Sequence, residues 1–349
     1  MAELFIELFS DEIPAQLQID ARQRIKLLIQ ERLQKKEIKL GLSKSFSTPK
    51  RLVFVIEGIE SKINKKEKII KGPKVDAPQI ALDGFIKSNN LIKADIYKKN
   101  LEKGEFYFAK IKSKSTDVLK ELELVIPEAL KAYSWKKSMR WADHDLNWGR
   151  PLKNIIAVFN NQTINFNFFH LSSSNKVLIE DDFGEKYKKI TSFKSYLDIL
   201  KSQNIILDQE KRKNYVTNKM DNLCKSRNLK SFFNEKLIEE VVNLVEKPTV
   251  IICKFNEVYL KIPKEILIIT MERHQKYFPL FDANNNLTSL FLIVANLADK
   301  KGYIKKGNQR VIEARLSDAK FFWDKNKKQN LIKQVGKLKN LNFFNSLGT

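Results

Sequence analysis

Histidines and cysteines, the residues that most often carry catalytic or metal-binding chemistry, are scarce in this 349-residue chain. His144–Asp145 resembles the centre of an HD phosphohydrolase dyad, which needs further His and Asp ligands on neighbouring helices. The other histidines, His170 and His274, lack that spacing, and the chain has no Walker loop, GxGxxG, GxSxG or HExxH motif. We therefore interpret His144–Asp145 as a surface pair and His274 as a cation at a helix C-terminus.

Positive charge is the strongest chemical signal. Lys and Arg number 64 against 41 Asp and Glu, a formal net charge of +23. An AT-rich coding sequence accounts for part of this excess, because Lys, Asn and Ile are all abundant. The remainder favours a polyanionic partner, since phosphates bound by Lys and Arg release counterions. Residues 300–340 hold eleven Lys and two Arg against three acids. We expect nucleic acid rather than an anionic membrane, because no stretch pairs a basic face with a strong Trp/Leu face.

Two pairs of arginines are candidate phosphate contacts. Arg140 lies within the aromatic segment MRWADHDLNW, and Arg150 follows two residues after its end. Arginine binds phosphate bidentately and tryptophan stacks on bases or riboses, although core packing explains these tryptophans equally well. Arg310 and Arg315 fall on an expected helix, where a spacing of five residues turns them to different sides, so that at most one contacts RNA. Pairing of Arg315 with Asp318, at i,i+3 spacing, is an equally good interpretation.

The elements that position these residues form a mixed α and β pattern without internal repeats. Strands are expected over 3–9 (half buried), 51–59, 106–111, 249–253, 277–281 and 290–295, with a hairpin of 155–159 and 164–168. Helices are expected over 14–36, 78–87 and 118–133, across most of 192–245, from 263, and over the last forty residues. This pattern predicts an α+β, multidomain fold with mixed short sheets and helical segments. A composition shift near 172–190 divides it into an α+β region (1–175), a mainly helical charged region (176–248) and an α+β region ending in basic helices (249–349).

Composition and termini narrow the class of protein. With 43% hydrophobic and 10% aromatic residues, the chain is neither wholly disordered nor fibrous. Cys224 and Cys253 lie far apart and outside any CxxC, which excludes a disulfide scaffold or cysteine zinc site and suits a reducing compartment. The N-terminus carries acids where a signal peptide needs a basic leader, and the longest apolar run, Leu290 to Ala295, is too short to span a bilayer. We expect a cytoplasmic protein.

Long, specific motifs occur in order along nearly the whole chain. They are ELFSDEIP (7–14), TPKRL (48–52), KGP (71–73), MRW (139–141), WGRPL (148–152), EEVVNLVEKP (239–248), MERHQKYFP (271–279), GNQRVIEARLSDA (307–319) with FFW (321–323), and LGT (347–349). In type and order they resemble the beta subunit of bacterial heterotetrameric glycyl-tRNA synthetase. That family continues past the LGT motif, so the chain resembles its N-terminal half. Where the family commonly has GHRF, this chain has EDDF at 180–183, which reverses the local charge.

The resemblance implies a tRNA-binding subunit without a catalytic centre of its own. In this family the alpha subunit holds the site for glycine, ATP and the tRNA 3′ end, and the subunits form an α2β2 heterotetramer. The resemblance therefore places ATP and Mg²⁺ on the alpha subunit and implies no cofactor, catalytic residue or metal ligand here. The candidate tRNA contacts are Lys50, Arg51, Arg140, Arg150, Lys305, Lys306, Arg310 and Arg315. Two alternatives stay open: an HD-type or editing-type hydrolase acting on a nucleotide or mischarged tRNA, and an inactive RNA-binding remnant.

Overall fold

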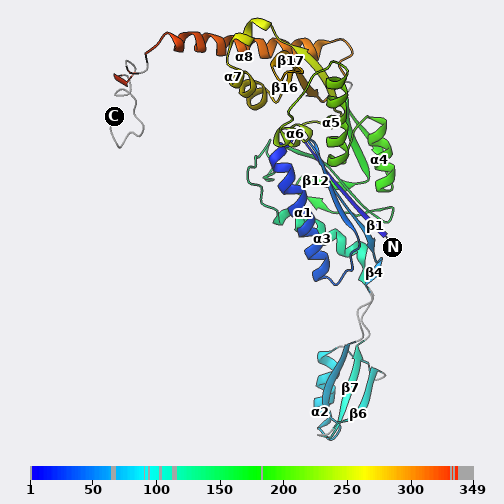
Figure 1. The fold of residues 1–349 in the computed structure, drawn as a ribbon. Coiled ribbons are helices and arrows are strands. Elements are labelled where there is room, and N and C mark those ends of the chain that lie inside the picture. Colours follow the sequence, from blue (N-terminus) through cyan, green and yellow to red (C-terminus); the bar gives the residue numbers. More distant parts are fainter. Residues whose placement is uncertain are drawn as a thin grey trace.

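The computed structural model describes residues 2–63, 68–89, 91–92, 95–101, 104–111, 116–181, 184–330, 332 and 335–336. These residues form an α+β fold with several small mixed sheets, which confirms the fold class predicted from the sequence. Figure 1 shows a sheet with α1 and α3 on one face, a second sheet beside α8, and a separate inserted unit beyond β4. None of the helices in the described ranges is long and apolar enough to cross a membrane.

The first sheet is built around β1. Its strands run in the order β11-β12-β9-β1-β3-β2, with β10 also pairing β9. The bounds are β1 (Ala2–Ser10), β2 (Ser43–Thr48), β3 (Arg51–Ile59), β9 (Leu152–Phe159), β10 (Gln162–Thr163), β11 (Asn167–Phe168) and β12 (Leu171–Ser174). β1 is antiparallel to both β3 and β9, whereas β12 is parallel to β9.

Both faces of this sheet are buried. On one face Leu4, Ile6 and Leu8 pack under α1 (Ala15–Lys35) and α3 (Val118–Ala132). On the other, Phe5 packs with Tyr196 of α4 (Phe193–Ser202). The half-buried strand expected at 3–9 is therefore buried on both sides, because residues distant in sequence cover its second face.

The hairpin expected after β9 is only partly correct. Asn160 and Asn161 form the turn, with φ of 47° and 64°, the left-handed region that asparagine tolerates. The return strand is β10, only two residues long. Phe168, expected in the same strand, instead lies in β11 and pairs with β12. The expectation of one strand over 164–168 is wrong because the chain leaves the hairpin after Thr163 and adds a different edge to the sheet.

The segment after β12 completes the first core. Strands β13 (Lys176–Asp181) and β14 (Gly184–Lys189) form a hairpin. Val177, Leu200 and Leu207 join Phe5 in one apolar cluster on the first sheet. The expected boundary at 175/176 thus falls between β12 and β13, while packing against the first sheet continues to Leu207.

The second core follows. The mainly helical segment expected over 192–245 contains α4, α5 (Gln209–Lys225) and α6 (Glu235–Val242). Helices α5 and α6 pack on a sheet ordered β15-β17-β16, with bounds Thr249–Lys254, Leu287–Ala295 and Phe278–Phe281. The opposite face is covered by a 3₁₀ turn (Glu257–Lys261), α7 (Lys264–Ile269), a π turn (Thr270–His274) and α8 (Tyr303–Lys327). His274 ends the π turn, at a helical C-terminus as the sequence indicates.

A small unit is inserted between β3 and α3. Strands β4 (Lys62–Ile63) and β8 (Thr116–Asp117) pair at its base. Beyond them, β5 (Lys68–Lys74), β6 (Ile96–Leu101) and β7 (Gly104–Ile111) form a sheet ordered β5-β7-β6, accompanied by α2 (Gln79–Ser88). The sequence indicated α2 and β7 but not the two outer strands, whose runs KIIKGPK and IYKKNL lack a clean apolar alternation.

A buried ion pair crosses the first sheet. Arg51 and Glu7 are 1% and 0% exposed, and Arg51 Nη1 lies 2.5 Å from Glu7 Oε1. The Tyr196 hydroxyl donates to the same oxygen at 2.6 Å, and Arg51 Nη2 donates to the carbonyl of Leu178 at 3.0 Å. Glu246, ahead of β15, approaches Arg51 Nε at 3.6 Å. The network joins β1 and β3 to the β13 hairpin, α4 and the second core.

Replacing Arg51 should be far more damaging than replacing a surface arginine. Arg51→Met leaves the Glu7 carboxylate buried without its cation, which costs about 3–5 kcal/mol. Arg24→Met, at an exposed position of α1, is the matched control and should stay within about 0.5 kcal/mol of the parent. Urea denaturation measures both. Equal midpoints for the two variants would show that the buried pair does not stabilise the fold.

Candidate nucleic-acid interface

Helix α8 divides into a buried side and a basic side. Ile312 and Leu316 are fully buried in the second core, and Asn308 accepts a hydrogen bond from the Tyr277 hydroxyl at 2.6 Å. Lys306 and Arg310, four residues apart and therefore on one face, are exposed. The buried stripe thus fixes the rotation of α8 and directs these two cations outward.

The remaining candidates on α8 differ in exposure. Lys305 is half-buried, whereas Arg315 is exposed but rotated by about 140° from Arg310 around the helix axis. Neither Arg310 nor Arg315 forms an ion pair within 4.0 Å with any residue in the described ranges, so the Arg315–Asp318 pair considered above does not form. Lys306 and Arg310 are the pair best placed to contact one strand of phosphates.

The N-terminus of α8 is not itself an anion site. Asp299 accepts hydrogen bonds from the backbone N–H groups of Ile304 and Lys305, at 3.0 and 2.9 Å. Its carboxylate thus satisfies the donors and the positive helix end that would otherwise attract phosphate. The cations that α8 offers to a phosphate are therefore those of its side chains.

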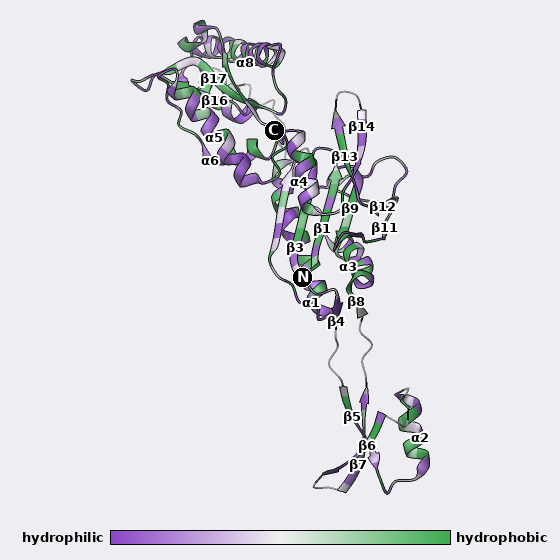
Figure 2. Ribbon diagram, turned by 90° about the vertical axis from the view of Figure 1, so that its right-hand side faces the viewer, coloured by the Kyte–Doolittle hydropathy of each residue, from purple (hydrophilic) through white to green (hydrophobic). Residues whose placement is uncertain are grey.

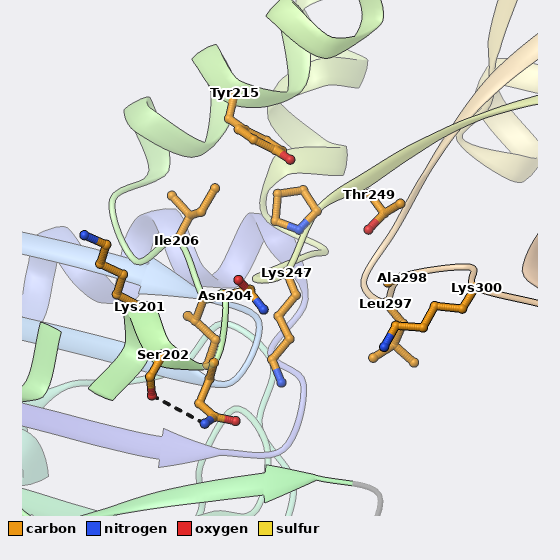
Figure 3. Close-up of a pocket in the computed structure, with 13 residues that line it drawn as sticks. Lys201, Ser202, Asn204, Ile206, Tyr215, Lys247, Thr249, Leu297, Ala298 and Lys300 are labelled. Carbon is orange, nitrogen blue, oxygen red and sulfur yellow. Dashed lines mark hydrogen bonds between the residues drawn. The ribbon is translucent and has the colours of Figure 1, made fainter. Parts of the chain in front are cut away.

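A basic pocket lies just ahead of α8. Its volume is about 770 Å³, and it opens between the α4–α5 connection, the start of β15 and the loop that follows β17 (Figure 3). Lys247 and Lys300 stand on two sides of the opening, Lys201 lies at its edge, and Tyr215 projects from α5. None of the described lining residues is acidic. The pocket can therefore take an anionic group, and Lys300 connects it to the basic run that leads into α8.

The loop with Arg140 and Arg150 is held mainly by its aromatic residues. Trp135 and Trp148 are 8% and 1% exposed and pack edge to face at 5.1 Å, which confirms the core interpretation for these two. Arg140 is exposed but paired with Asp145 at 3.0 Å. Arg150 is half-buried and donates to the carbonyl of Gly149 at 2.7 Å. Both arginines already have local partners, so they are weaker candidates for contacting phosphate than Lys306 and Arg310.

The histidines do not form a metal centre. His144 stacks face to face on His170, with ring centroids 3.6 Å apart and planes 2° apart, and Trp141 meets both rings edge-on. Burial, followed by the neighbouring His144, lowers the pKa of His170. Asp145, the other half of the proposed dyad, pairs with Arg140. Within the described ranges no group of three or more His, Cys, Asp or Glu could hold a metal ion. These residues give the HD-type hydrolase no support.

Two more predicted contacts belong to the interior or to internal ion pairs. Arg51 is enclosed in the buried network, so its assignment as an RNA contact is wrong; the TPKRL segment turns it inward because alternate residues of β3 line the second sheet face. Lys50 is about a quarter exposed and lies 2.5 Å from Glu180, which also accepts from Lys153 at 2.8 Å. Glu180 of the EDDF segment thus neutralises nearby cations; Asp182 and Phe183 lie outside the described residues.

The sequence does not predict the basic pocket. Its lysines come from positions 201, 247 and 300, on three separate segments that only the fold brings together. Of the three lysines, only Lys300 belongs to a pattern that the sequence reveals, the basic run from 300 to 340. The sequence also offers the apolar residues Phe343, Phe344 and Leu347 as candidate contacts for a partner subunit, but these three lie outside the described residues. The described part of the same region does expose Phe321 and Phe322, which are 62% and 57% accessible.

Comparison with known proteins gives one consistent result. A family model described as the glycyl-tRNA synthetase beta subunit matches residues 4–349. The chain is 35% identical over 357 residues to the glycine–tRNA ligase beta subunit of Rickettsia felis, and 34% identical over 350 residues to those of Rickettsia akari and Rickettsia typhi. Each alignment covers 100% of this chain and 53% of the relative. The chain therefore spans about half the length of these relatives.

The ion pairs of Glu180 should make the free energy of unfolding depend on pH. Burial favours the neutral acid, but hydrogen bonds from Lys153 and Lys50 outweigh it and lower the pKa of Glu180 below 4.5. The resulting stabilisation is present above pH 4.5 and is lost as the pH falls through the lowered pKa. Glu180→Gln should therefore cost up to about 1 kcal/mol at pH 7 and progressively less in acid. Urea midpoints at several pH values measure this gap.

Glu185→Gln is the control for that measurement. Glu185 faces Glu180 across the same hairpin but is half exposed and 4.0 Å from Lys153. It should change stability less than Glu180→Gln at pH 7. A Glu180→Gln deficit that stays constant down to pH 3 would contradict the assignment.

Proposed function

Because the chain belongs to the glycyl-tRNA synthetase beta subunit family, we propose that it is a tRNA-binding, non-catalytic part of glycine–tRNA ligase. The observation that carries the proposal is the basic face of α8, where Lys306 and Arg310 form no ion pair with any described residue, beside a pocket lined by lysines and no described acid. Cations that have no internal partner are available to phosphates, whereas Arg51 and Lys50 are not.

Phosphate contacts of this kind position an RNA without reading its sequence. The α8 face offers Lys and Arg side chains to a backbone, and its N-terminus, capped by Asp299, offers no further donors. The proposed role is therefore to hold and orient tRNA while another subunit performs the chemistry.

In this proposal the alpha subunit catalyses glycine + tRNA + ATP → glycyl-tRNA + AMP + diphosphate. ATP and Mg²⁺ bind there, and this chain joins it in an α2β2 heterotetramer in the cytoplasm. Two features support the division of labour: this chain has no glycine-rich phosphate loop, and its described residues have no metal-binding group. An editing-type hydrolase has no positive support from the geometry, and an inactive RNA-binding remnant would differ only in failing to support charging.

Removing charge from α8 should weaken tRNA binding. Lys306→Ala with Arg310→Ala should lower affinity roughly tenfold at low salt and reduce the slope of log affinity against log salt by about 2. Arg24→Ala with Lys35→Ala removes the same charge from exposed positions of α1 and is the control. Filter binding across a salt series measures both. Equal losses in the two double variants would show that net charge, and not the α8 face, binds tRNA.

Sequence preference should be weak. We expect this chain to prefer glycine tRNA over an unrelated RNA of equal length by less than a hundredfold, because its contacts are to phosphates. Salt-insensitive binding, or a larger preference, would contradict the proposed mode.

Adenylate formation should require the partner. Glycine-dependent ATP–pyrophosphate exchange should be at background with this chain alone, because its sequence has no glycine-rich phosphate loop and its described residues form no metal-binding group. Exchange should appear when the alpha subunit is added. The assay compares chain, alpha subunit and mixture; exchange by the chain alone would overturn the non-catalytic assignment.

A further inference from the structure

No helix among the described residues covers one face of the inserted three-stranded sheet. Gly72 of β5 shows which face α2 covers, since a Cβ at this position would lie 2.8 Å from the ring of Phe85. Ala109 of β7 is fully buried on the same side. Figures 1 and 2 show α2 on only one side of this sheet. The opposite face is exposed at its edges, with Ile69 and Tyr97 55% and 37% accessible.

The strand register gathers aromatic and basic residues on this free face. Residues paired across antiparallel strands point to the same side. Phe108 is paired with Lys71 on one side and Tyr97 on the other, and Phe106 with Lys74 and Lys99. We call the resulting surface the platform; its residues are Lys71, Lys74, Tyr97, Lys99, Phe106 and Phe108. The register assigns no Asp or Glu to it among the described residues.

The platform interleaves rings and ammonium groups. Tyr97 and Phe108 stack with centroids 6.0 Å apart and planes 27° apart. Lys71 Nζ lies 3.6 Å from the centroid of Phe106, and Lys99 Nζ lies 6.0 Å from that of Phe108. Both phenylalanines are half-buried under these lysine stems. When the lysines turn outward to an anion, the ring faces beneath them become available for stacking.

This combination selects a ligand with flat aromatic groups and regularly spaced negative charges. A purely apolar protein partner would bury the ammonium groups without counter-charges, which is costly. A nucleic-acid duplex offers phosphates but hides its base faces in the stack. Unpaired nucleotides offer both, and stacking on aromatic side chains next to a basic track is how sheet surfaces commonly bind single strands.

We propose that the platform binds unpaired RNA nucleotides, stacking bases on Phe106, Phe108 and Tyr97 and holding the adjoining phosphates with Lys71, Lys74 and Lys99. The inference rests on the proposed function for the identity of the polyanion as RNA, but it uses a surface separate from α8. It therefore assigns this chain a second contact, directed at a single-stranded segment of its RNA.

Binding of a labelled octauridylate and of a labelled 12-base-pair RNA duplex to the full chain, followed by anisotropy, tests this proposal. Phe106→Leu with Phe108→Leu keeps apolar bulk but removes the rings. It should weaken octauridylate binding about tenfold and leave duplex binding within twofold. Unchanged far-ultraviolet circular dichroism and urea midpoint would show that the unit remains folded.

A charge variant provides the matched comparison. Lys99→Gln removes a platform cation. Lys98→Gln removes the neighbouring cation, which lies on the opposite face of the sheet with its Nζ 5.9 Å from the centroid of the Tyr107 ring. Lys99→Gln should weaken octauridylate binding several-fold and lower its salt slope by about 0.7, and Lys98→Gln should do neither.

Three outcomes would overturn the proposal. The first is unchanged octauridylate binding in the double leucine variant, and the second is equal effects of Lys98→Gln and Lys99→Gln. The third comes from a vesicle-binding assay: the platform variants lose binding to phosphatidylserine vesicles while their octauridylate binding is unchanged. The proposed function fails separately: it is contradicted if Lys306→Ala with Arg310→Ala leaves tRNA binding intact, whatever octauridylate does.

Discussion

The ion pair between Glu7 and Arg51 sets the arrangement of the main body. Both side chains are withdrawn from water, so each requires the other, and Tyr196 and Leu178 complete the hydrogen bonding. Burial raises the pKa of Glu7, while Arg51 and Tyr196 favour the ionised carboxylate. The partners come from β1, β3, the β13 hairpin and α4. A shift of any one of these elements would therefore leave a buried polar or charged group without a partner.

A second buried arginine connects the first sheet to the second core. Arg212 of α5 donates to the carbonyls of Val242, Ile206 and Ser47, at 2.8, 2.6 and 2.9 Å. Burial lowers its pKa to about 10. These contacts tie α5 to the end of α6 and to β2. One side chain therefore donates to backbone carbonyls of both the first sheet and the second core. Ile206, whose carbonyl accepts from Arg212, also lines the basic pocket, so this buried arginine helps to fix one wall of the pocket.

Cations in this protein consequently serve distinct purposes despite their similar chemistry. Arg51 and Arg212 are interior connectors, and Lys50 and Lys153 are neutralised by Glu180. Lys306 and Arg310 remain available, as do the platform lysines, whose closest described neighbours include aromatic rings. The net charge of +23 therefore includes cations that are already neutralised or buried, and the charge that we propose to meet RNA lies on α8, around the pocket and on the inserted sheet.

The sequence by itself determined the long elements and the family. The runs that became β1, α1, β3, α3 and α8 carry their own periodicity, and the ordered motifs need no tertiary contact to be recognised. Tertiary structure alone decided which cations are free, because Arg51 and Arg310 look alike in sequence and differ only in what packs around them. It also decided the platform and the pocket. Their residues come from strands and loops far apart in the chain, and strand register and packing, which no local pattern encodes, bring them together.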